Sequence, residues 1–259
     1  MTARPALEIA VTSPAGARAA RDEGADRVEL CAALELGGLT PSAALVEAVA
    51  REGLSVQVLV RCRPGDFVYD AEEIALMAAE VRSVIASGAG GVVIGALTAD
   101  GALDTAAVAR LAEAARAPGR PVDITLHRAI DQSADPVAAA ALLPSLGLTR
   151  VLTSGGAPTA AEGRETIAAM ASAAAQVQVM AGGGVRLADI PALISAGASA
   201  VHLSAKTRAP ARRGGRWVPL GAGGASAERD THFVTDPGVV AEARRAVDGA
   251  APFPPARPN

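Results

Sequence analysis

Short runs of branched apolar residues recur along the chain, and each run stops abruptly at a polar residue or a glycine. Runs of this kind are typical of strands that are buried on both faces of a parallel sheet. Eight such strands are predicted from the pattern. Three lie at residues 6–11, 122–127 and 177–181, and the other five begin a few residues after Gly24, Gly53, Gly88, Gly147 and Gly197.

The same five glycines mark a weak internal repeat, in which an alanine-rich segment of helical length ends and a strand begins. Glycine is favoured just past a helix because it adopts the left-handed conformation without a Cβ clash. Strands that alternate with helices imply a parallel sheet. Eight units of ~30 residues predict an α/β fold, a single (β/α)8 TIM-type barrel with parallel strands. A doubly wound open sheet is the alternative.

The domain organisation is predicted to be simple. No proline- or serine-rich linker divides residues 1–208, so no domain boundary is expected there. Residues 1–235 are predicted to form the barrel, with a long loop at 208–230 after the eighth strand. Residues 236–259 are assigned to the same domain, as a terminal helix over 236–249 and a frayed tail.

Polar side chains lie at the ends of several predicted strands, where the active sites of β/α barrels are built. Side chains two positions apart share a face of a strand, so the inward faces are expected to bring acids, a guanidinium and imidazoles into one mouth. These candidate catalytic residues are Glu8, Glu29, Arg61, His127 and His202. Burying such groups without partners is costly, so an ion pair between Arg61 and a glutamate is expected. In the alternative interpretation, Glu8 is only a structural partner of Arg61, and His202 is a core histidine.

Small residues follow the sixth, seventh and eighth predicted strands. Barrels of this type often bind an anion at the loops after strands seven and eight, through backbone N–H groups. The candidate anion-binding or substrate-binding residues are Ser154, Gly155, Gly182, Gly183, Gly184 and Ser204. The alternative is that the glycines only shape the strand ends. Arg128 is expected to point toward the outer helices, and Asp131 to cap the next helix.

Composition narrows the class of partner and the location. The 259 residues carry a formal net charge of −3, which gives no reason to expect nucleic acid or a membrane surface as a partner. Only 2% of the residues are aromatic, so the core is expected to consist of Ala, Val, Leu and Ile. Two cysteines cannot form a disulfide framework. The start shows no signal-peptide pattern, and no apolar run approaches the ~18 residues that span a bilayer. We therefore expect a cytoplasmic protein.

Several long motifs follow one another in a distinctive order: D-R-V-E-L-C-A-A-L-E-L-G-G-L-T-P-S (26–42), L-H-R-A-I-D (126–131), R-V-L-T-S-G-G (150–156), M-A-G-G-G-V (180–185) and H-L-S-A (202–205). In this order they resemble the CutC family, whose members are labelled as copper homeostasis proteins. The resemblance covers about residues 6–208. It implies a β/α barrel, a homodimer or higher homo-oligomer, and a part in copper homeostasis with Cu(I) as a partner.

The copper role that the resemblance implies depends on thiols. A typical member has a cysteine in a first strand similar to L-E-V-C-V and another in a second strand similar to I-E-L-C. Here Ala10 occupies the first position and Cys31 the second, while Cys62 is expected to face the outer helices. Cu(I) prefers two or more soft ligands, so Cys31, assisted by His127 or His202, is a poor site, and tight binding is not expected.

The residues themselves favour a second function, a metal-independent lyase or isomerase that acts on a small anionic or phosphorylated metabolite. Glu29 or Glu8 would be the general base, His127 the general acid or base, and Arg61 the clamp for a carboxylate or enolate. The glycine loops would hold a phosphate or carboxylate. A scaffold whose rim charges only pair with one another is a third interpretation.

Overall fold

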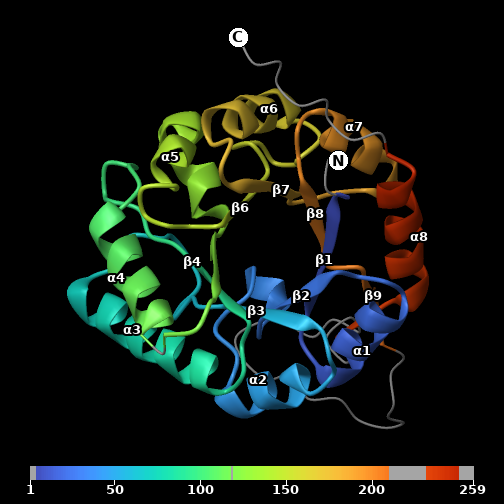
Figure 1. Ribbon diagram of the computed structural model, residues 1–259, viewed down its shortest axis with the longest axis horizontal. Helices are drawn as coiled ribbons and strands as arrows, with labels where there is room; N and C mark the ends of the chain where they lie inside the picture. The colour runs from blue at the N-terminus through green and yellow to red at the C-terminus, as the bar shows by residue number, and fades with distance from the viewer. Residues whose placement is uncertain (1–3, 118, 210–231, 251–259) are drawn as a thin grey trace, which may run out of the picture.

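Eight parallel strands close into a barrel in the computed structural model, which describes residues 4–117, 119–209 and 232–250 (Figure 1). Each strand pairs with the next along the chain, and the eighth pairs with the first. The predicted (β/α)8 barrel is therefore confirmed, and the alternative of an open sheet is wrong. The strands are β1 (Ala6–Val11), β2 (Arg27–Leu30), β3 (Ser55–Leu59), β4 (Gly91–Ile94), β5 (Asp123–Leu126), β6 (Arg150–Thr153), β7 (Gln178–Gly182) and β8 (Ala200–Leu203).

Helices form a ring outside the strands (Figure 1). Local sequence sets where several of them begin: the side chain of Ser13 accepts a hydrogen bond from the N–H of Gly16, and Asp135 caps the fifth helix ahead of Pro136. The α-helices are α1 (Pro14–Asp22), α2 (Ala43–Ala50), α3 (Ala71–Ala86), α4 (Thr105–Arg116), α5 (Pro136–Leu142), α6 (Arg164–Ala173), α7 (Ile190–Ser195) and α8 (Pro237–Asp248). The 3-10 helices η1 (Leu34–Leu36), η2 (Arg128–Gln132) and η3 (Leu187–Asp189) lie in the connections.

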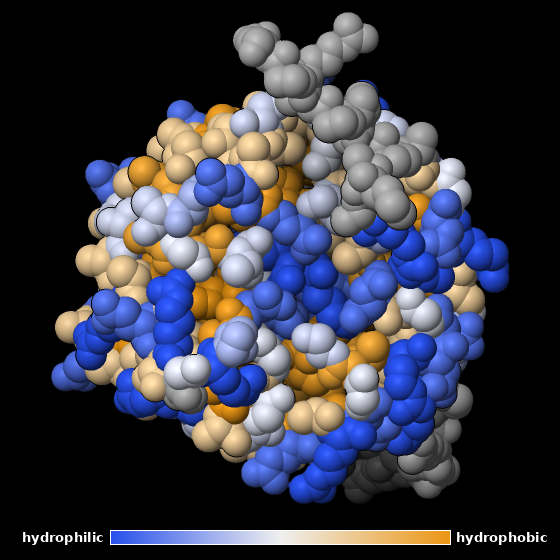
Figure 2. Space-filling view, in the orientation of Figure 1, coloured by the Kyte–Doolittle hydropathy of each residue, from blue (hydrophilic) through white to orange (hydrophobic). Residues whose placement is uncertain are grey.

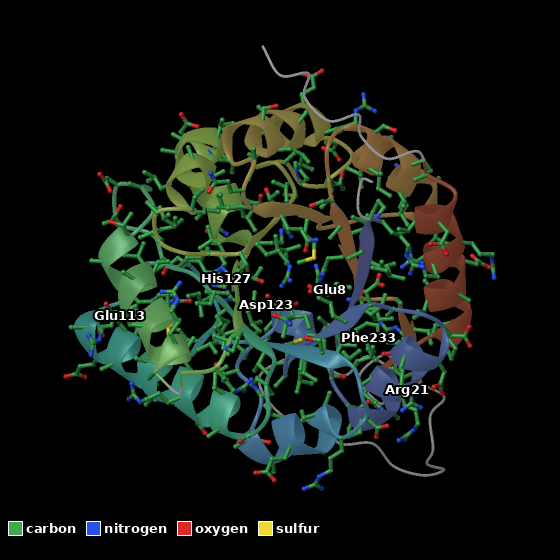
Figure 3. All side chains as sticks on the ribbon, viewed as in Figure 1. Glu8, Arg21, Glu113, Asp123, His127 and Phe233 are labelled. Carbon is green, nitrogen blue, oxygen red and sulfur yellow. The ribbon has the colours of Figure 1, made fainter. Side chains whose placement is uncertain are left out.

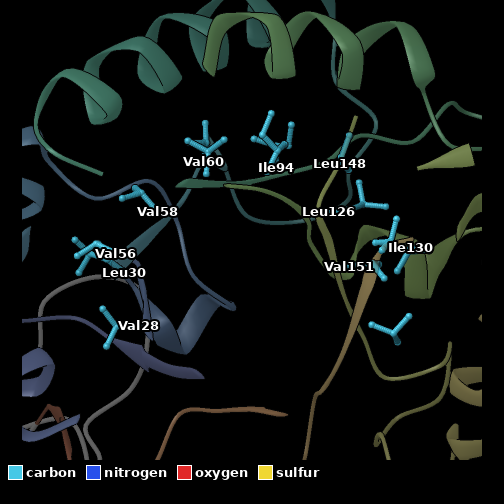
Figure 4. Packing of buried hydrophobic residues seen from close by; sticks show 14 of the residues in the cluster. Val28, Leu30, Val56, Val58, Val60, Ile94, Leu126, Ile130, Leu148 and Val151 are labelled. Carbon is cyan, nitrogen blue, oxygen red and sulfur yellow. The ribbon is translucent and has the colours of Figure 1, made fainter. Parts of the chain in front are cut away.

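The hydrophobic core lies between the outward faces of the strands and the helices (Figure 4). Val28 and Leu30 of β2, and Val58 of β3, point into this layer and are fully buried. Small side chains such as those of Ala17 and Ala20 let α1 approach the strands closely, and both are fully buried. Close packing of aliphatic residues thus builds the core with few aromatic rings.

Left-handed glycines separate the helices from the strands, as the repeat predicts. Gly88 after α3 has a φ of 102°, and Gly197 after α7 has a φ of 103°. Residues with a Cβ rarely adopt this conformation, so glycine at these positions ends the helix and turns the chain into the next strand.

A two-stranded antiparallel sheet, β9 (Lys206–Arg208) and β10 (Phe233–Thr235), follows the barrel strands. The predicted helix at 236–249 is confirmed as α8, and Arg244 joins it to the barrel through a 2.8 Å ion pair with Asp26. Most of the predicted loop at 208–230 and the predicted tail lie outside the described residues. Within the ranges that the structure describes, no helix is both long and apolar enough to cross a bilayer.

Candidate functional site

A network of polar side chains fills the barrel at the amino-terminal ends of the strands. Arg27 donates to Glu8 (2.5 Å) and Gln178 (2.9 Å), while Arg150 donates to Gln178 (2.7 Å) and Asp123 (3.2 Å). Figure 3 labels Glu8 and Asp123 near the middle of the ring, and Figure 2 shows hydrophilic residues gathered there. Because this network occupies one end of the barrel, we expect a ligand to enter from the opposite end.

The ion pair predicted between Arg61 and a glutamate is wrong. Arg27, which was not among the candidate residues, pairs with Glu8 instead, because these two are register partners on β1 and β2. Arg27 lies two positions before Glu29, so strand alternation did contain a signal that its side chain points inward.

His202 lies between two carboxylates. Its Nδ1 is 2.9 Å from Oε1 of Glu8, and its Nε2 is 3.6 Å from Oε2 of Glu29. Burial opposes the charged form of Glu8, but the hydrogen bond with His202 and the charge of Arg27 outweigh it and lower the pKa of Glu8 to about 2. At Glu29 burial prevails and raises the pKa to about 7. Burial alone would lower the pKa of His202, but the charges of Glu29 and Glu8 raise it.

These shifts give the three groups different protonation behaviour. Glu8 is a fixed anion, His202 is stabilised as a cation, and Glu29 exchanges its proton near neutral pH. A carboxyl group whose pKa is close to the working pH is suited to general acid–base chemistry. Glu29 is therefore the carboxyl group of this trio with a pKa near neutrality, while Glu8 holds His202 through a hydrogen bond.

A cavity of about 350 Å³ opens at the carboxyl ends of the strands. Four of the five predicted catalytic residues line it: Glu29, Arg61, His127 and His202. Glu8 does not line the cavity; it is fully buried and reaches it only through His202. The structure thus brings side chains from four separate segments of the chain to one place.

Arg61 is a buried cation without an ion-pair partner among the described residues. Its Nη1 donates to the carbonyls of Leu36 (3.0 Å) and Gly38 (3.2 Å), and its Nη2 donates to the carbonyl of Gly65 (2.7 Å). Its guanidinium lies 5.0 Å from the ring centroid of Phe67, and Nε has no hydrogen-bond partner in the described chain. With 7% of the residue exposed, this charge lies in the wall of the cavity with little water to screen it.

His127 is held by its own backbone turn at the end of β5. Its Nδ1 accepts a hydrogen bond from the N–H of Ala129 at 3.1 Å. Its ring lies 4.8 Å from that of Phe67, and it is 4% exposed. Burial, together with the nearby charge of Arg61, lowers the pKa of His127 to about 3. The imidazole is therefore neutral, which does not fit the predicted role of a general acid or base near neutral pH.

The loops after β7 and β8 line the cavity with residues whose backbone N–H groups are unused within the described chain. Gly183, Gly184, Ser204 and Ala205 line it, and in the described part of the chain their N–H groups donate to no acceptor. Gly183 and Ala205 have φ values of 101° and 42°, both in the left-handed region. Successive N–H groups in such turns form concavities that bind anions.

The other predicted loop residues do not contribute donors to the cavity. The N–H of Ser154 donates to Asp131, and the N–H of Gly155 donates to the hydroxyl of Thr153. Gly182 does not line the cavity; a Cβ there would lie 2.5 Å from Leu152 and 3.2 Å from His202, so a larger residue would have to displace the Leu152 side chain. The anion-binding role predicted for these three residues is therefore not supported by their geometry.

Arg128 lines the cavity, and the expectation that it points toward the outer helices is wrong. It begins η2, so the alternation of β5 no longer applies to it. Its Nε donates to Asp131 at 2.7 Å, and its Nη2 donates to the hydroxyl of Ser154 at 2.9 Å. Asp131 also accepts from the hydroxyl of Thr153, so it joins two loops, and no cap on the next helix is formed by it.

Cys31 lines the cavity, but the donors around it do not fit a copper ion. Its thiol packs with Leu59 and Val93 and is 1% exposed. Burial raises the pKa of Cys31 and so disfavours the thiolate that binds metals. Over the described ranges, no group of three or more His, Cys, Asp or Glu residues is arranged to hold a metal ion. Cys62 packs against the hydrophobic core between the strands and the helices, in agreement with the prediction that it faces the outer helices.

Comparison with known proteins gives a consistent result. The model of the CutC family matches residues 6–207. A CutC family protein from Xanthomonas campestris pv. campestris (strain B100) is 46% identical over 207 residues, which cover 79% of this chain and 84% of the relative. A relative from Xylella fastidiosa (strain Temecula1) is 46% identical over 211 residues, with coverages of 80% and 77%.

A solved structure agrees with these relatives. The CutC protein of Streptococcus agalactiae, which carries a provisional copper homeostasis name, superposes with a TM-score of 0.70 at 26% identity. The superposition covers 77% of this chain and 98% of the solved one. On the family match and the close relatives together, the chain belongs to the CutC family.

Proposed function

We propose that the mouth of the barrel binds a small organic anion. Glu29 would remove a proton from this anion and return it, as in a metal-independent lyase or isomerase. The observation that carries the proposal is Arg61, a buried guanidinium that lines the cavity and forms no ion pair within the described residues. Burial of an unpaired charge is costly, so a site of this kind gains most from an anionic ligand.

The free amides extend the anion site. The N–H groups of Gly183, Gly184, Ser204 and Ala205 lie at the loops after the seventh and eighth strands, where barrels of this fold commonly bind phosphate or carboxylate. A cavity of about 350 Å³ suits a metabolite-sized ligand. Arg61 and these amides supply two separate positions for negatively charged or polar groups of one small molecule.

Proton transfer is assigned to Glu29 because its surroundings differ from those of Glu8. Arg27 and His202 hold Glu8 as a permanent anion, which in turn orients the ring of His202 through a 2.9 Å hydrogen bond. Glu29 lies 3.6 Å from the other nitrogen of that ring and has a pKa of about 7. It is therefore the carboxyl group able to accept and return a proton near neutral pH.

Copper homeostasis is the second candidate function, and it rests on the family and on the name of the Streptococcus agalactiae protein. Direct Cu(I) binding by this chain is the weaker form of that candidate, because Cys31 is the single thiol at the cavity. A cytoplasmic location and a homo-oligomeric state complete the proposal. Both rest on the resemblance, and two free cysteines suit a reducing compartment.

The test is thermal unfolding of the whole chain with a panel of small carboxylates and phosphates. A ligand present at 100 times its Kd is expected to stabilise the protein by about 2.7 kcal/mol. The stabilisation should disappear in Arg61→Met. Arg63→Met is the matched control, because Arg63 pairs with Glu73 and Asp66 and does not line the cavity. A panel without any stabilising anion, or full stabilisation in Arg61→Met, would refute the proposal.

A further inference from the structure

The proton of the His127 ring has a fixed position. Nδ1 accepts the hydrogen bond from the N–H of Ala129, so the proton of the neutral ring is on Nε2. That Nε2–H is buried and has no hydrogen-bond partner among the described residues, although His127 lines the cavity. A buried donor that is left unpaired costs about 1–3 kcal/mol, so a ligand oxygen that reaches Nε2 would recover this cost.

The ring cannot readily change its orientation. Phe67 packs on it with 4.8 Å between the ring centroids and an interplanar angle of 43°. Gly95 also lies against the ring: a Cβ there would be 2.6 Å from Cε1 and 3.2 Å from Nε2 of His127. Only glycine leaves room for the imidazole at this position. The ring is thus in close contact with both an aromatic side chain and a glycine backbone.

The charged groups that face His127 keep it neutral. Arg61 is the near cation, and Asp131 is the near anion. Burial and the repulsion by Arg61 outweigh the attraction by Asp131, and the pKa falls to about 3. The imidazole is therefore a hydrogen-bond donor that neither gains nor loses a proton across the physiological range.

We propose that His127 is a fixed neutral donor whose Nε2–H binds a carbonyl oxygen of the ligand. This inference rests on the proposed function and narrows the ligand to a small 2-oxo acid or a similar carbonyl compound. The carboxylate of such a molecule neutralises Arg61, and the carbonyl oxygen, which has no proton of its own, accepts the hydrogen bond from His127.

The same arrangement fits the chemistry at Glu29. When the Glu29 carboxylate removes a proton from the carbon beside the carbonyl, the C–H bond breaks and an O–H bond forms on Glu29. The electron pair moves to the carbonyl oxygen and gives an enolate, and the Nε2–H of His127 stabilises that oxygen while keeping its own proton. Return of the proton from Glu29 to carbon restores the carbonyl, so the step balances without any other reactant.

The first measurement needs no ligand. The chain contains three histidines, so nitrogen NMR of the full protein labelled with ¹⁵N-histidine can follow each ring, with His127→Gln used for assignment. His127 is expected to show the neutral Nε2–H form throughout about pH 5–9. A ring that becomes protonated in this range, or one that carries its proton on Nδ1, would overturn the inference. The wild-type spectrum decides this even where a variant fails to fold.

The second measurement compares pyruvate with propionate, which has the same chain length and carboxylate but no carbonyl. Pyruvate is expected to shift the His127 Nε2 resonance and to bind about tenfold more weakly to His127→Leu, with partial recovery in His127→Gln, which retains an N–H donor. Propionate is expected to be insensitive to both substitutions.

The outcomes separate the two proposals. If both acids bind through Arg61 but neither responds to His127, the anion site stands and the inference about His127 is wrong. If pyruvate and propionate fail to bind and no other carboxylate or phosphate of the panel binds, the proposed function is wrong, and the assignment of a carbonyl ligand is wrong with it.

Discussion

Glu8 and His202 are register partners on the neighbouring strands β1 and β8, and their side chains share a 2.9 Å hydrogen bond inside the barrel. On its other side, β1 places Glu8 in register with Arg27 of β2. The fully buried Glu8 carboxylate therefore holds two cationic groups. Arg27 lies at the amino-terminal end of the barrel, and His202 lies at the cavity. This links the stability of the barrel to the orientation of a site residue.

Replacing Glu8 by glutamine is expected to lower the free energy of unfolding by about 3 kcal/mol or more, because it leaves the buried charge of Arg27 without its anion. Urea denaturation near pH 7 measures the change. Glu52→Gln is the control, since Glu52 pairs with the half-exposed Arg18 and should cost less than about 1 kcal/mol. Equal costs for the two variants would contradict the structural role of Glu8.

The same pair sets a pH dependence on the acid side. The pKa of Glu8 in the folded chain, about 2, lies below its ordinary value of 4.5, so its contribution to stability is fully present above that ordinary value. The contribution is lost as the pH falls from there toward 2. Wild-type protein is therefore expected to lose more stability than Glu8→Gln over this interval, as followed by urea unfolding at each pH.

Glu29 is expected to show the opposite sign. Its pKa in the folded chain, about 7, lies above the ordinary value of 4.5, so folding favours the protonated form and stability falls as the pH rises between these values. Glu29→Gln removes this loss. The variant should be more stable than wild type at pH 8, by at most about 3 kcal/mol, and nearly equal to it at pH 4.5. An unchanged difference between the two proteins over this range would show that Glu29 is not shifted.

Strand alternation decides which residues of the site can be predicted from the sequence. The prediction fails where the alternation of side chains ends. Glu29 and His202 lie within their strands, and Arg61 and His127 lie one or two residues past theirs, so a period of two places all four inward. Alternation does not give the register, which is the shift of one strand along its neighbour. Only the register shows that Glu8 meets Arg27 and not Arg61.

The loops were harder to predict for a related reason. Arg128 begins a 3-10 turn, so it leaves the strand pattern and lines the cavity. The use of backbone N–H groups in the loops was equally hard to predict. Those of Ser154 and Gly155 are used by Asp131 and Thr153, whereas those of Gly183 and Gly184 are not used within the described chain. Both loops contain paired glycines, so their composition cannot separate them; their hydrogen bonds can.

Gly95→Ala tests the close contact at His127. The φ of Gly95 is not in the left-handed region, so the cost of the substitution is steric, from a Cβ placed 2.6 Å from the imidazole. We expect a loss of about 1–3 kcal/mol in the free energy of unfolding. In a His127→Ala background the same substitution should cost much less, because the clashing ring is absent. Gly249→Ala, at an ordinary φ of −79°, is the control for glycine replacement as such.

Copper binding depends on how many thiols reach the cavity. Titration of the reduced protein with Cu(I) against a competing chelator is expected to show no tight site, because one buried thiol with a raised pKa is a weak ligand. Cys31→Ala should change little, and so should Cys62→Ala, whose thiol lies in the outer core. A tight site that is lost only in Cys31→Ala would contradict the expectation.

The converse experiment adds a ligand in place of removing one. Ala10 of β1 and Cys31, one residue past the end of β2, both line the cavity, and Ala10 is in register with Glu29, two positions before Cys31. Ala10→Cys would therefore add a second thiol on the same inward face, diagonally across from Cys31, and two soft ligands suffice for Cu(I). We expect at least a tenfold gain in Cu(I) affinity, abolished by adding Cys31→Ala. If Ala10→Cys gains nothing, the missing thiol is not the reason why this cavity fits copper poorly.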